Sequence, residues 1–207
     1  MDCSWYTKTM MYQEKKFDIP ELAGISRESV AQHLVLYAGY VKNFNAMTAL
    51  AGELMSADKE KNAPAIVELM RRRSFEFGGM RLHELYFPQF EGGSTALTTS
   101  GLMESALKAQ YGNPEYCVQE IRNVAGMRGP GWALLYFDHE AKQFLVGWSS
   151  EQHIGHFATL PVILALDVWE HAFVLDYGAA GKGKYIDAFW NNLNWSVCER
   201  RFADTQK

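Results

Sequence analysis

One stretch of sequence decides the fold, residues 162–171, which read VILALDVWEH. Its first five residues are apolar and partly β-branched, which predicts a short buried strand at residues 162–166. Asp167 and His171 follow this strand directly. An ionisable side chain at the end of a buried strand costs free energy unless it binds a partner, and a carboxylate with an imidazole suits a metal ion. The alternative is that Asp167 caps a helix and that His171 is incidental.

Two further strand patterns precede this stretch, at residues 131–137 and 143–148. A polar turn at residues 138–140 separates them. Helical patterns flank the three strands, at residues 98–111, 115–126, 184–192 and 195–202. We therefore expect a three-stranded antiparallel sheet wrapped by helices.

The first half of the chain reads as two long helices. Residues 26–57 form one helical pattern, with Ser26 as a plausible N-cap. Residues 58–62 are a charged break, and a second helical pattern runs over residues 64–87 until Pro88 ends it. Two long helices with a short connection predict an antiparallel hairpin.

A Gly-rich segment at residues 91–94 separates the two halves and is the best candidate for a domain boundary. We expect an α+β fold, with an N-terminal helical hairpin domain at residues 1–93 and a C-terminal α/β domain at residues 94–207.

A histidine lies in the apolar seam of each long helix. The first seam recurs at three- and four-residue steps and contains Val30, His33, Tyr37, Tyr40, Phe44 and Met47. In the second helix, His83 lies beside Tyr86 and Phe87. A neutral imidazole buried among aromatic side chains must find a polar partner or cost free energy. His33 and His83 are therefore candidates for a shared site.

The composition excludes several classes of protein. The chain has 207 residues, of which 48% are hydrophobic and 21% are charged, so it folds into a globular protein. Its net charge of -4 argues against a nucleic-acid partner. The three cysteines, Cys3, Cys117 and Cys198, lie far apart and suit a reducing compartment. No apolar run approaches the roughly 18 residues of a membrane span, so we expect no membrane partner and a cytoplasmic location.

The stretch DVWEHA at residues 167–172 resembles the motif of the iron/manganese superoxide dismutases. Residues 129–133, GPGWA, and residues 189–195, FWNNLNW, resemble two other parts of that family. The resemblance extends over nearly the whole chain. It implies a helical hairpin followed by three strands and helices, superoxide as the small-molecule substrate, and one Mn or Fe ion per chain.

The resemblance also implies a ligand set to which each half of the chain contributes two residues: His33, His83, Asp167 and His171. The first helix departs from the family pattern. Tyr40 begins a YVxN-like stretch, and the family ligand lies eight positions earlier, which is Gln32 here. Alignment from the upstream Ser26 gives His33 instead. We expect His33, because an amide is a poor substitute for imidazole at a redox metal.

The resemblance assigns further roles around the ion. Gln152 would donate a hydrogen bond to the metal-bound solvent, with Gly79 leaving space for it beside His83. This is the manganese-like arrangement, so manganese is slightly favoured. Tyr40 would be the gateway tyrosine that helps to admit substrate and deliver protons, and Tyr37 stands where the family often has a histidine in the outer sphere.

Glu170 resembles the family glutamate that contacts the ligand histidine of another subunit, so we expect a homodimer or homotetramer. Phe173 replaces the tyrosine that commonly links the subunits, which predicts fewer hydrogen bonds there. Lys182, with Lys42 as a second possibility, would attract the anionic substrate.

The main hypothesis is therefore a superoxide dismutase, an oxidoreductase with an antioxidant role. The alternative is a superoxide dismutase-like metal-binding or interaction protein without efficient dismutase activity, suggested by the departures in the first helix and near Phe173. A mononuclear hydrolase or oxygenase with similar ligands is a weaker third interpretation.

Overall fold

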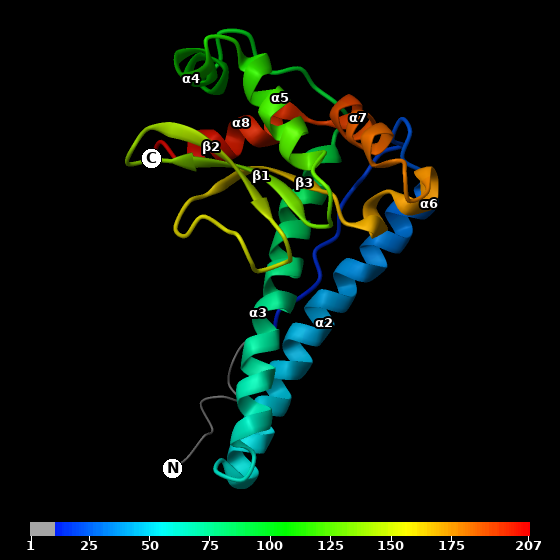
Figure 1. Ribbon diagram of the computed structural model, residues 1–207, viewed down its shortest axis with the longest axis vertical. Helices are drawn as coiled ribbons and strands as arrows, with labels where there is room; N and C mark the ends of the chain where they lie inside the picture. Colours follow the sequence, from blue (N-terminus) through cyan, green and yellow to red (C-terminus); the bar gives the residue numbers. More distant parts are fainter. Residues whose placement is uncertain (1–10) are drawn as a thin grey trace.

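The computed structural model describes residues 11–207, so the predicted free cysteine at position 3 lies outside the described residues. Two long helices run side by side as a hairpin that extends away from the sheet (Figure 1): α2 (Arg27–Asp58) and α3 (Ala63–Tyr86). The Ser26 hydroxyl accepts a hydrogen bond from the main-chain N–H of Ser29, which confirms the predicted N-cap.

The second helix ends one residue earlier than predicted. Pro88 has no N–H with which to continue an α-helix, and the chain tightens into the 3₁₀ helix η1 (Phe87–Phe90). His83 therefore lies in the last turn of α3, close to the point where the hairpin meets the sheet.

The sheet has the predicted three antiparallel strands, in the order β2-β1-β3. They are β1 (Trp132–Asp138), β2 (Gln143–Ser149) and β3 (Val162–Asp167). In the central strand β1, Trp132 pairs with Asp167 on one side and with Ser149 on the other. The register thus brings the end of β3 next to a large aromatic side chain.

Helices surround this sheet: α4 (Leu102–Tyr111), α5 (Pro114–Ala125), η2 (Glu170–Ala172), α6 (Val174–Tyr177), α7 (Lys182–Asn192) and α8 (Trp195–Asp204). Contacts join α5 to β1 and β2, and α8 to β3. The short elements η2 and α6 are not evident in the sequence pattern.

The helix α4 begins at Leu102, whereas the sequence predicts a start at residue 98. Thr98 is not part of the helix. Its main-chain N–H and its hydroxyl both donate to the carboxylate of Glu199 in α8. Ser100 also has a φ of 59°, in the left-handed region, which a helix does not permit.

Buried polar side chains fix the end of α3 against β3. The amide of Gln89 pairs with the main chain of Ala165: Nε2 donates to the carbonyl at 2.6 Å, and the main-chain N–H donates to Oε1 at 2.9 Å. Arg201 donates to the carbonyls of Leu85 and Ile163, at 2.6 and 3.2 Å. These bonds set the position of the hairpin relative to the strand that ends in Asp167.

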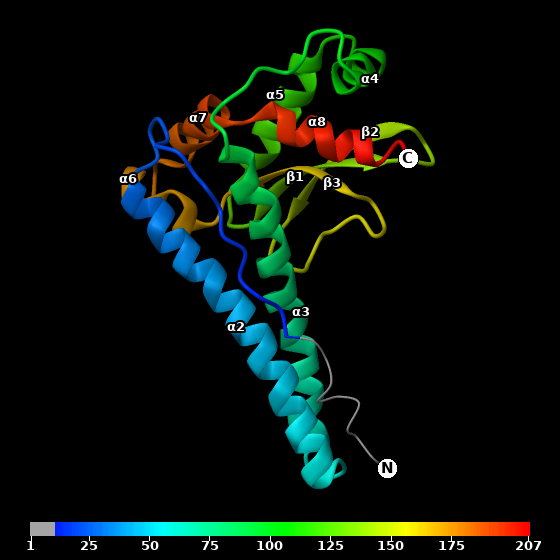
Figure 2. The same cartoon turned by 180° about the vertical axis from the view of Figure 1, so that it is seen from behind.

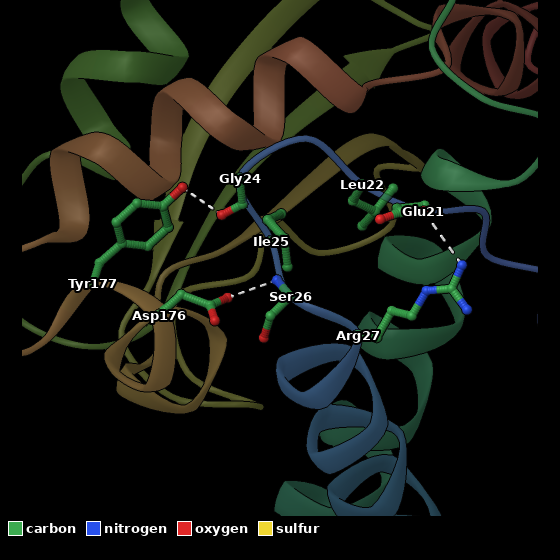
Figure 3. A pocket seen from close by; sticks show the side chains of 8 residues that line it. All are labelled: Glu21, Leu22, Gly24, Ile25, Ser26, Arg27, Asp176 and Tyr177. Atoms are coloured by element: carbon green, nitrogen blue, oxygen red, sulfur yellow. Dashed lines mark hydrogen bonds and ion pairs between the residues drawn. The ribbon is translucent and has the colours of Figure 1, made fainter.

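A second junction holds the N-terminal end of α2 (Figure 3). Asp176 accepts a hydrogen bond from the main-chain N–H of Ser26 at 2.9 Å, and the Tyr177 hydroxyl donates to the carbonyl of Gly24. The segment before α2 runs along the hairpin (Figure 2), and Asp18 there donates its main-chain N–H to Glu91. The domain boundary near residue 93 remains a prediction.

No helix within residues 11–207 has the length and the apolar character that crossing a bilayer requires.

Candidate metal centre

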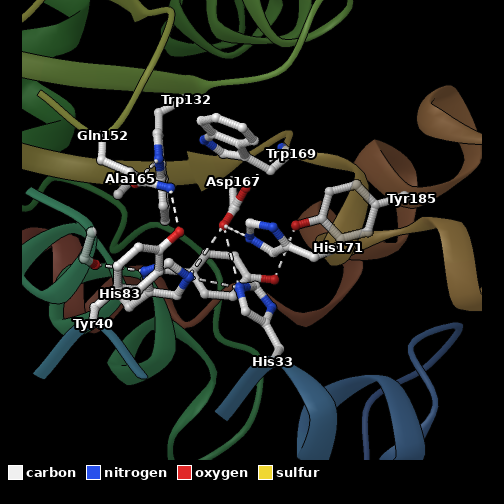
Figure 4. A network of polar contacts seen from close by, with 12 residues as sticks. His33, Tyr40, His83, Trp132, Gln152, Ala165, Asp167, Trp169, His171 and Tyr185 are labelled. Carbon is white, nitrogen blue, oxygen red and sulfur yellow. Dashed lines mark hydrogen bonds and ion pairs between the residues drawn. The ribbon is translucent and has the colours of Figure 1, made fainter. Parts of the chain in front are cut away.

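Four side chains from four elements converge where the hairpin meets the sheet (Figure 4): His33 from α2, His83 from α3, Asp167 from the end of β3 and His171 from η2. Each offers one ligand atom, and these four atoms lie within 4.8 Å of one another. The sequence-based ligand set is thus brought to one place.

The distances within this cluster are short. The Nε2 atoms of His33 and His83 are 2.9 Å apart. Oδ2 of Asp167 lies 3.2 Å from Nε2 of His33, 3.6 Å from Nε2 of His83 and 3.1 Å from Nε2 of His171. All four ligand atoms therefore point at one small volume.

The histidine His83 is held in one tautomer. Its Nδ1 lies 2.6 Å from the carbonyl oxygen of Gly79, to which it donates, so Nε2 carries a free lone pair that faces the cluster. Burial, with the nearby His33, lowers the pKa of His83 to about 3. Burial also lowers the pKa of His33, so both imidazoles are neutral at pH 7 and free to bind a cation.

Asp167 is fully buried, and burial alone would raise the pKa of its carboxyl group. The contacts with His171 and His33 outweigh that effect, and the pKa of Asp167 lies below its ordinary value. Among the described residues, the ion-pair partners of this carboxylate are three imidazoles. Within the described part of the chain no Lys or Arg pairs with this buried negative charge, and a carboxylate surrounded by three imidazoles fits a bound cation.

Aromatic rings enclose the cluster. Trp132 contacts His83 edge to face, with ring centroids 5.1 Å apart, and Trp169 stacks on His171 at 6.0 Å. Phe87 lies 5.0 Å from His33. The side chain of His171 is 22% exposed, whereas those of the other three are at most 4% exposed, so the described chain leaves the cluster accessible on the His171 side.

The side chains of Gln152 and Tyr40 meet beside the cluster (Figure 4). The fully buried Gln152 accepts a hydrogen bond from Nε1 of Trp132 at 2.9 Å and donates from Nε2 to the Tyr40 hydroxyl at 3.0 Å. The Tyr40 ring lies 5.2 Å from that of His83. Burial, followed by the charge of Asp167, raises the pKa of Tyr40, so this hydroxyl keeps its proton at neutral pH.

Comparisons with known proteins agree with this geometry. The family described as iron/manganese superoxide dismutases, C-terminal domain, matches residues 99–201. The chain is 32% identical over 202 residues to the protein named superoxide dismutase [Fe] of Cupriavidus metallidurans, covering 94% of this chain and 98% of that protein. It is 30% identical over 190 residues to the protein of that name from Aquifex pyrophilus, covering 90% and 88%. The identity is 28% over 207 residues for the protein of that name from Saccharolobus solfataricus, covering 93% and 96%.

The chain belongs to the iron/manganese superoxide dismutases. The resemblance seen in the sequence is therefore confirmed, as is the α+β fold.

In this superoxide dismutase family member, the positions of the side chains show which residue of the first helix, Gln32 or His33, faces the cluster. Gln32 is exposed and donates to Glu28 at 2.7 Å, whereas the adjacent His33 is buried in the cluster. Seven residues make about two turns of an α-helix, at 3.6 residues per turn. Tyr40 consequently lies on the same face as His33 despite the shortened spacing.

The two glycines near His83 allow close contacts with other elements. A Cβ atom built at Gly79 would lie 2.5 Å from the Tyr40 ring, so the absence of a side chain lets that ring pack against α3. At Gly78 a Cβ atom would lie 1.9 Å from the main-chain oxygen of Gln152. The glycine pair allows close approach of one aromatic ring and one loop carbonyl.

Tyr37 belongs to a second buried network. Its hydroxyl donates to Glu84 at 3.2 Å and accepts from the main-chain N–H of Lys15 at 2.9 Å. Glu84 also pairs with the side chains of Lys15 and Arg81, at 3.0 and 2.6 Å. Glu84 was not among the predicted site residues. Its signal is a charged residue adjacent to His83 on the inner side of a helix.

The other predicted residues lie away from the cluster. Glu170 is exposed and lines a surface hollow with Phe173 and Lys182. His139 is exposed in the turn between β1 and β2, and His153 and His156 lie in the loop between β2 and β3. His153 is half-buried there and His156 is exposed. The structure adds a specific contact for His156, described below.

Proposed function

We propose that this protein disproportionates superoxide to dioxygen and hydrogen peroxide at a single Fe or Mn ion held by His33, His83, Asp167 and His171. The observation that carries the proposal is the convergence of three imidazoles and one carboxylate on one point in a member of this family. Imidazole and carboxylate donors together suit redox-active first-row metals.

The overall reaction balances over two superoxide ions. The first gives up one electron and leaves as dioxygen, and the second takes up one electron and two protons and leaves as hydrogen peroxide. When bound, the ion supplies the one-electron chemistry between these two half-reactions. The protein's own residues hold the site in shape and supply protons.

The four proposed ligands supply a fixed charge pattern. The bond from Nδ1 of His83 to the Gly79 carbonyl orients the imidazole and keeps Nε2 free, as outer hydrogen bonds do at metal sites generally. Asp167 contributes one negative charge to the proposed metal site. The buried rings of Trp132 and Phe87 help to exclude water from this site.

Tyr40 and Gln152 are the residues that we propose to supply protons at the site. Tyr40 retains its phenolic proton, and its oxygen accepts from the amide of Gln152, so the hydroxyl proton is free to be shared with substrate. Trp132 fixes the other end of that amide. Tyr37, bonded to Glu84, stiffens α2 and α3 behind the site rather than joining this chain of bonds.

Approach of the anion is proposed from the side on which His171 is exposed. The ammonium group of Lys182 donates to the carbonyls of Met127 and Gly129, at 2.6 and 2.8 Å, which fixes a positive charge beside Glu170. We place the subunit contact of a homodimer or homotetramer on this face, with Glu170 reaching the partner.

The choice between Fe and Mn is part of the proposal. The relatives compared above carry iron in their names, and they give no support to a preference for manganese. The one argument for manganese is the position of Gln152 on a loop, which resembles the manganese-like arrangement.

The test is elemental analysis of the native protein together with an assay of superoxide removal after reconstitution with each metal. We expect close to one Fe or Mn ion per chain and catalytic turnover. Metal-loaded protein without dismutase activity would contradict the proposal and favour a dismutase-like metal-binding protein.

A further inference from the structure

The loop between β2 and β3 must present Gln152 accurately, yet it contains no regular secondary structure from residue 150 to residue 161. Its hydrogen bonds are therefore what hold the main chain at Gln152. Ser149 is one such partner, because its hydroxyl lies 2.6 Å from the carbonyl of Glu151 and 2.8 Å from that of Ile154. Neither of these carbonyls belongs to Gln152 itself.

The partner of the Gln152 main chain is His156. Nε2 of His156 lies 3.1 Å from the carbonyl oxygen of Gln152, and Nδ1 lies 3.2 Å from the hydroxyl of Tyr136 in the central strand β1. The imidazole thus bridges the loop residue and the sheet.

The surroundings of Tyr136 set the direction of these bonds. Its hydroxyl has one proton to donate, and Nδ1 of His156 is the acceptor that the described hydrogen bonds offer it. Burial raises the pKa of Tyr136 to about 12, and the phenol keeps that proton. Nε2 of His156 then bears the hydrogen and donates to the Gln152 carbonyl.

That carbonyl is confined on its other side. It lies against Gly78 of α3, where a Cβ atom would be only 1.9 Å from the oxygen. The carbonyl of Gln152 is therefore held between α3 and His156. Displacing it moves the amide that bonds to Trp132 and Tyr40.

We propose that His156 is a positioning residue for the dismutase reaction, which holds the Gln152 main chain so that the Gln152 amide meets Tyr40 and Trp132. The inference rests on the proposed function for its effect on turnover. It goes beyond the four proposed ligands, because His156 contacts none of them among the contacts described above.

The experiment compares four variants of the full chain loaded with its metal: His156→Phe, His156→Gln, Tyr136→Phe and the control His139→Phe. Phenylalanine keeps ring volume and removes both ring nitrogens, whereas glutamine retains an N–H donor. His139 is exposed in a turn, so its replacement controls for loss of a histidine. For each variant we measure metal content, kcat and KM separately, and the dissociation constant of azide.

For His156→Phe we expect metal content to be unchanged and kcat to fall by about tenfold, as is typical of changes to groups that orient a metal site. The azide affinity should shift in the same direction as in Gln152→Ala, which is measured alongside. Tyr136→Phe, which removes one oxygen atom, shifts both quantities the same way to a smaller extent. His156→Gln recovers most of kcat, and His139→Phe matches the wild type.

A double-mutant cycle separates positioning from general stability. In a Gln152→Ala background, His156→Phe should lower kcat no further, since its effect passes through Gln152. A full additional loss in that background would overturn the inference, as would wild-type kcat and azide affinity in His156→Phe. Should the wild type itself carry metal without dismutase activity, the proposed function fails, and the azide affinities then test the positioning role alone.

Discussion

The two halves of the metal cluster are built in different ways. Asp167 and His171 lie within five residues of each other, on one bend of the chain after β3. Local backbone geometry holds this pair, since Asp167 accepts from the main-chain N–H of Trp169 at 2.8 Å. His33 and His83 lie fifty residues apart on two helices, and only tertiary contacts bring them together.

The geometry of each half of the cluster depends on a different kind of contact. The β3 half depends on a strand register and one turn, which the sequence specifies locally. The helical half depends on the packing of α2 against α3 and on remote bonds such as those of Gln89 to Ala165. Changes in the first half should act on metal binding directly, whereas changes in the second act on metal binding only at His33 and His83 and otherwise on turnover.

The largest effect is expected for Asp167→Asn. Loss of the cluster's only carboxylate should abolish metal retention and also lower the stability of the metal-free protein, because the contacts with His171 and His33 that hold the pKa of Asp167 below its ordinary value are lost. Elemental analysis and thermal unfolding check both outcomes. Asp138→Asn, at the exposed end of β1, is the control. A full metal complement in Asp167→Asn would show that the cluster does not need its carboxylate.

In the helical half, His33→Ala should also abolish metal retention, because no other imidazole of the described residues can take its place in the cluster. The neighbouring substitution Gln32→Ala should leave metal content unchanged, since Gln32 is exposed and bonded to Glu28. Metal analysis of the two variants decides the register of α2. The reverse result would assign the ligand to Gln32.

A smaller effect is expected for Tyr40→Phe. The ring still fills the space beside Gly79, but the hydroxyl that accepts from Gln152 is lost. We expect metal content to be retained and kcat to fall by about tenfold. Tyr116→Phe, at an exposed position of α5, is the matched control. Unchanged turnover in Tyr40→Phe would remove this hydroxyl from the proposed proton supply.

The smallest effect concerns Tyr37 and appears only at high pH. Burial raises the pKa of Tyr37 to about 12, against an ordinary value near 10. Between these two values the unfolded chain releases a proton that the folded chain keeps, so the free energy of unfolding falls as the pH rises.

Urea unfolding between pH 9 and pH 12 measures this slope. In Tyr37→Phe the decline above pH 10 should be shallower than in the wild type. Equal slopes in the two proteins would mean that the phenol titrates normally in the folded state.

The comparison also explains what could be predicted from the sequence. The three strands and the hairpin follow from periodicity and turn residues, and the bounds of the strands were wrong by at most one residue. The pair Asp167 and His171 was evident from a charged motif after an apolar strand. The early start predicted for α4 was wrong because Glu199, about a hundred residues away, accepts a hydrogen bond from the main-chain N–H of Thr98.

The roles that the sequence does not reveal share this long-range character. Glu84 and His156 act through partners on other elements, Tyr37 in one case and Tyr136 in the other. The contact of the Tyr40 ring with Gly79 was not predicted for the same reason, since packing between two helices is not visible in either helix alone. The local sequence pattern specifies the helices and strands, whereas the contacts between them are known only from the three-dimensional structure.

The most direct test of the account is anomalous X-ray diffraction from crystals of the native protein, recorded at the Fe and Mn absorption edges. We expect one peak per chain, at one of the two edges, within bonding distance of Nε2 of His33, Nε2 of His83, Oδ2 of Asp167 and Nε2 of His171. A peak elsewhere in the chain, or one that lacks His33 among its ligands, would contradict it.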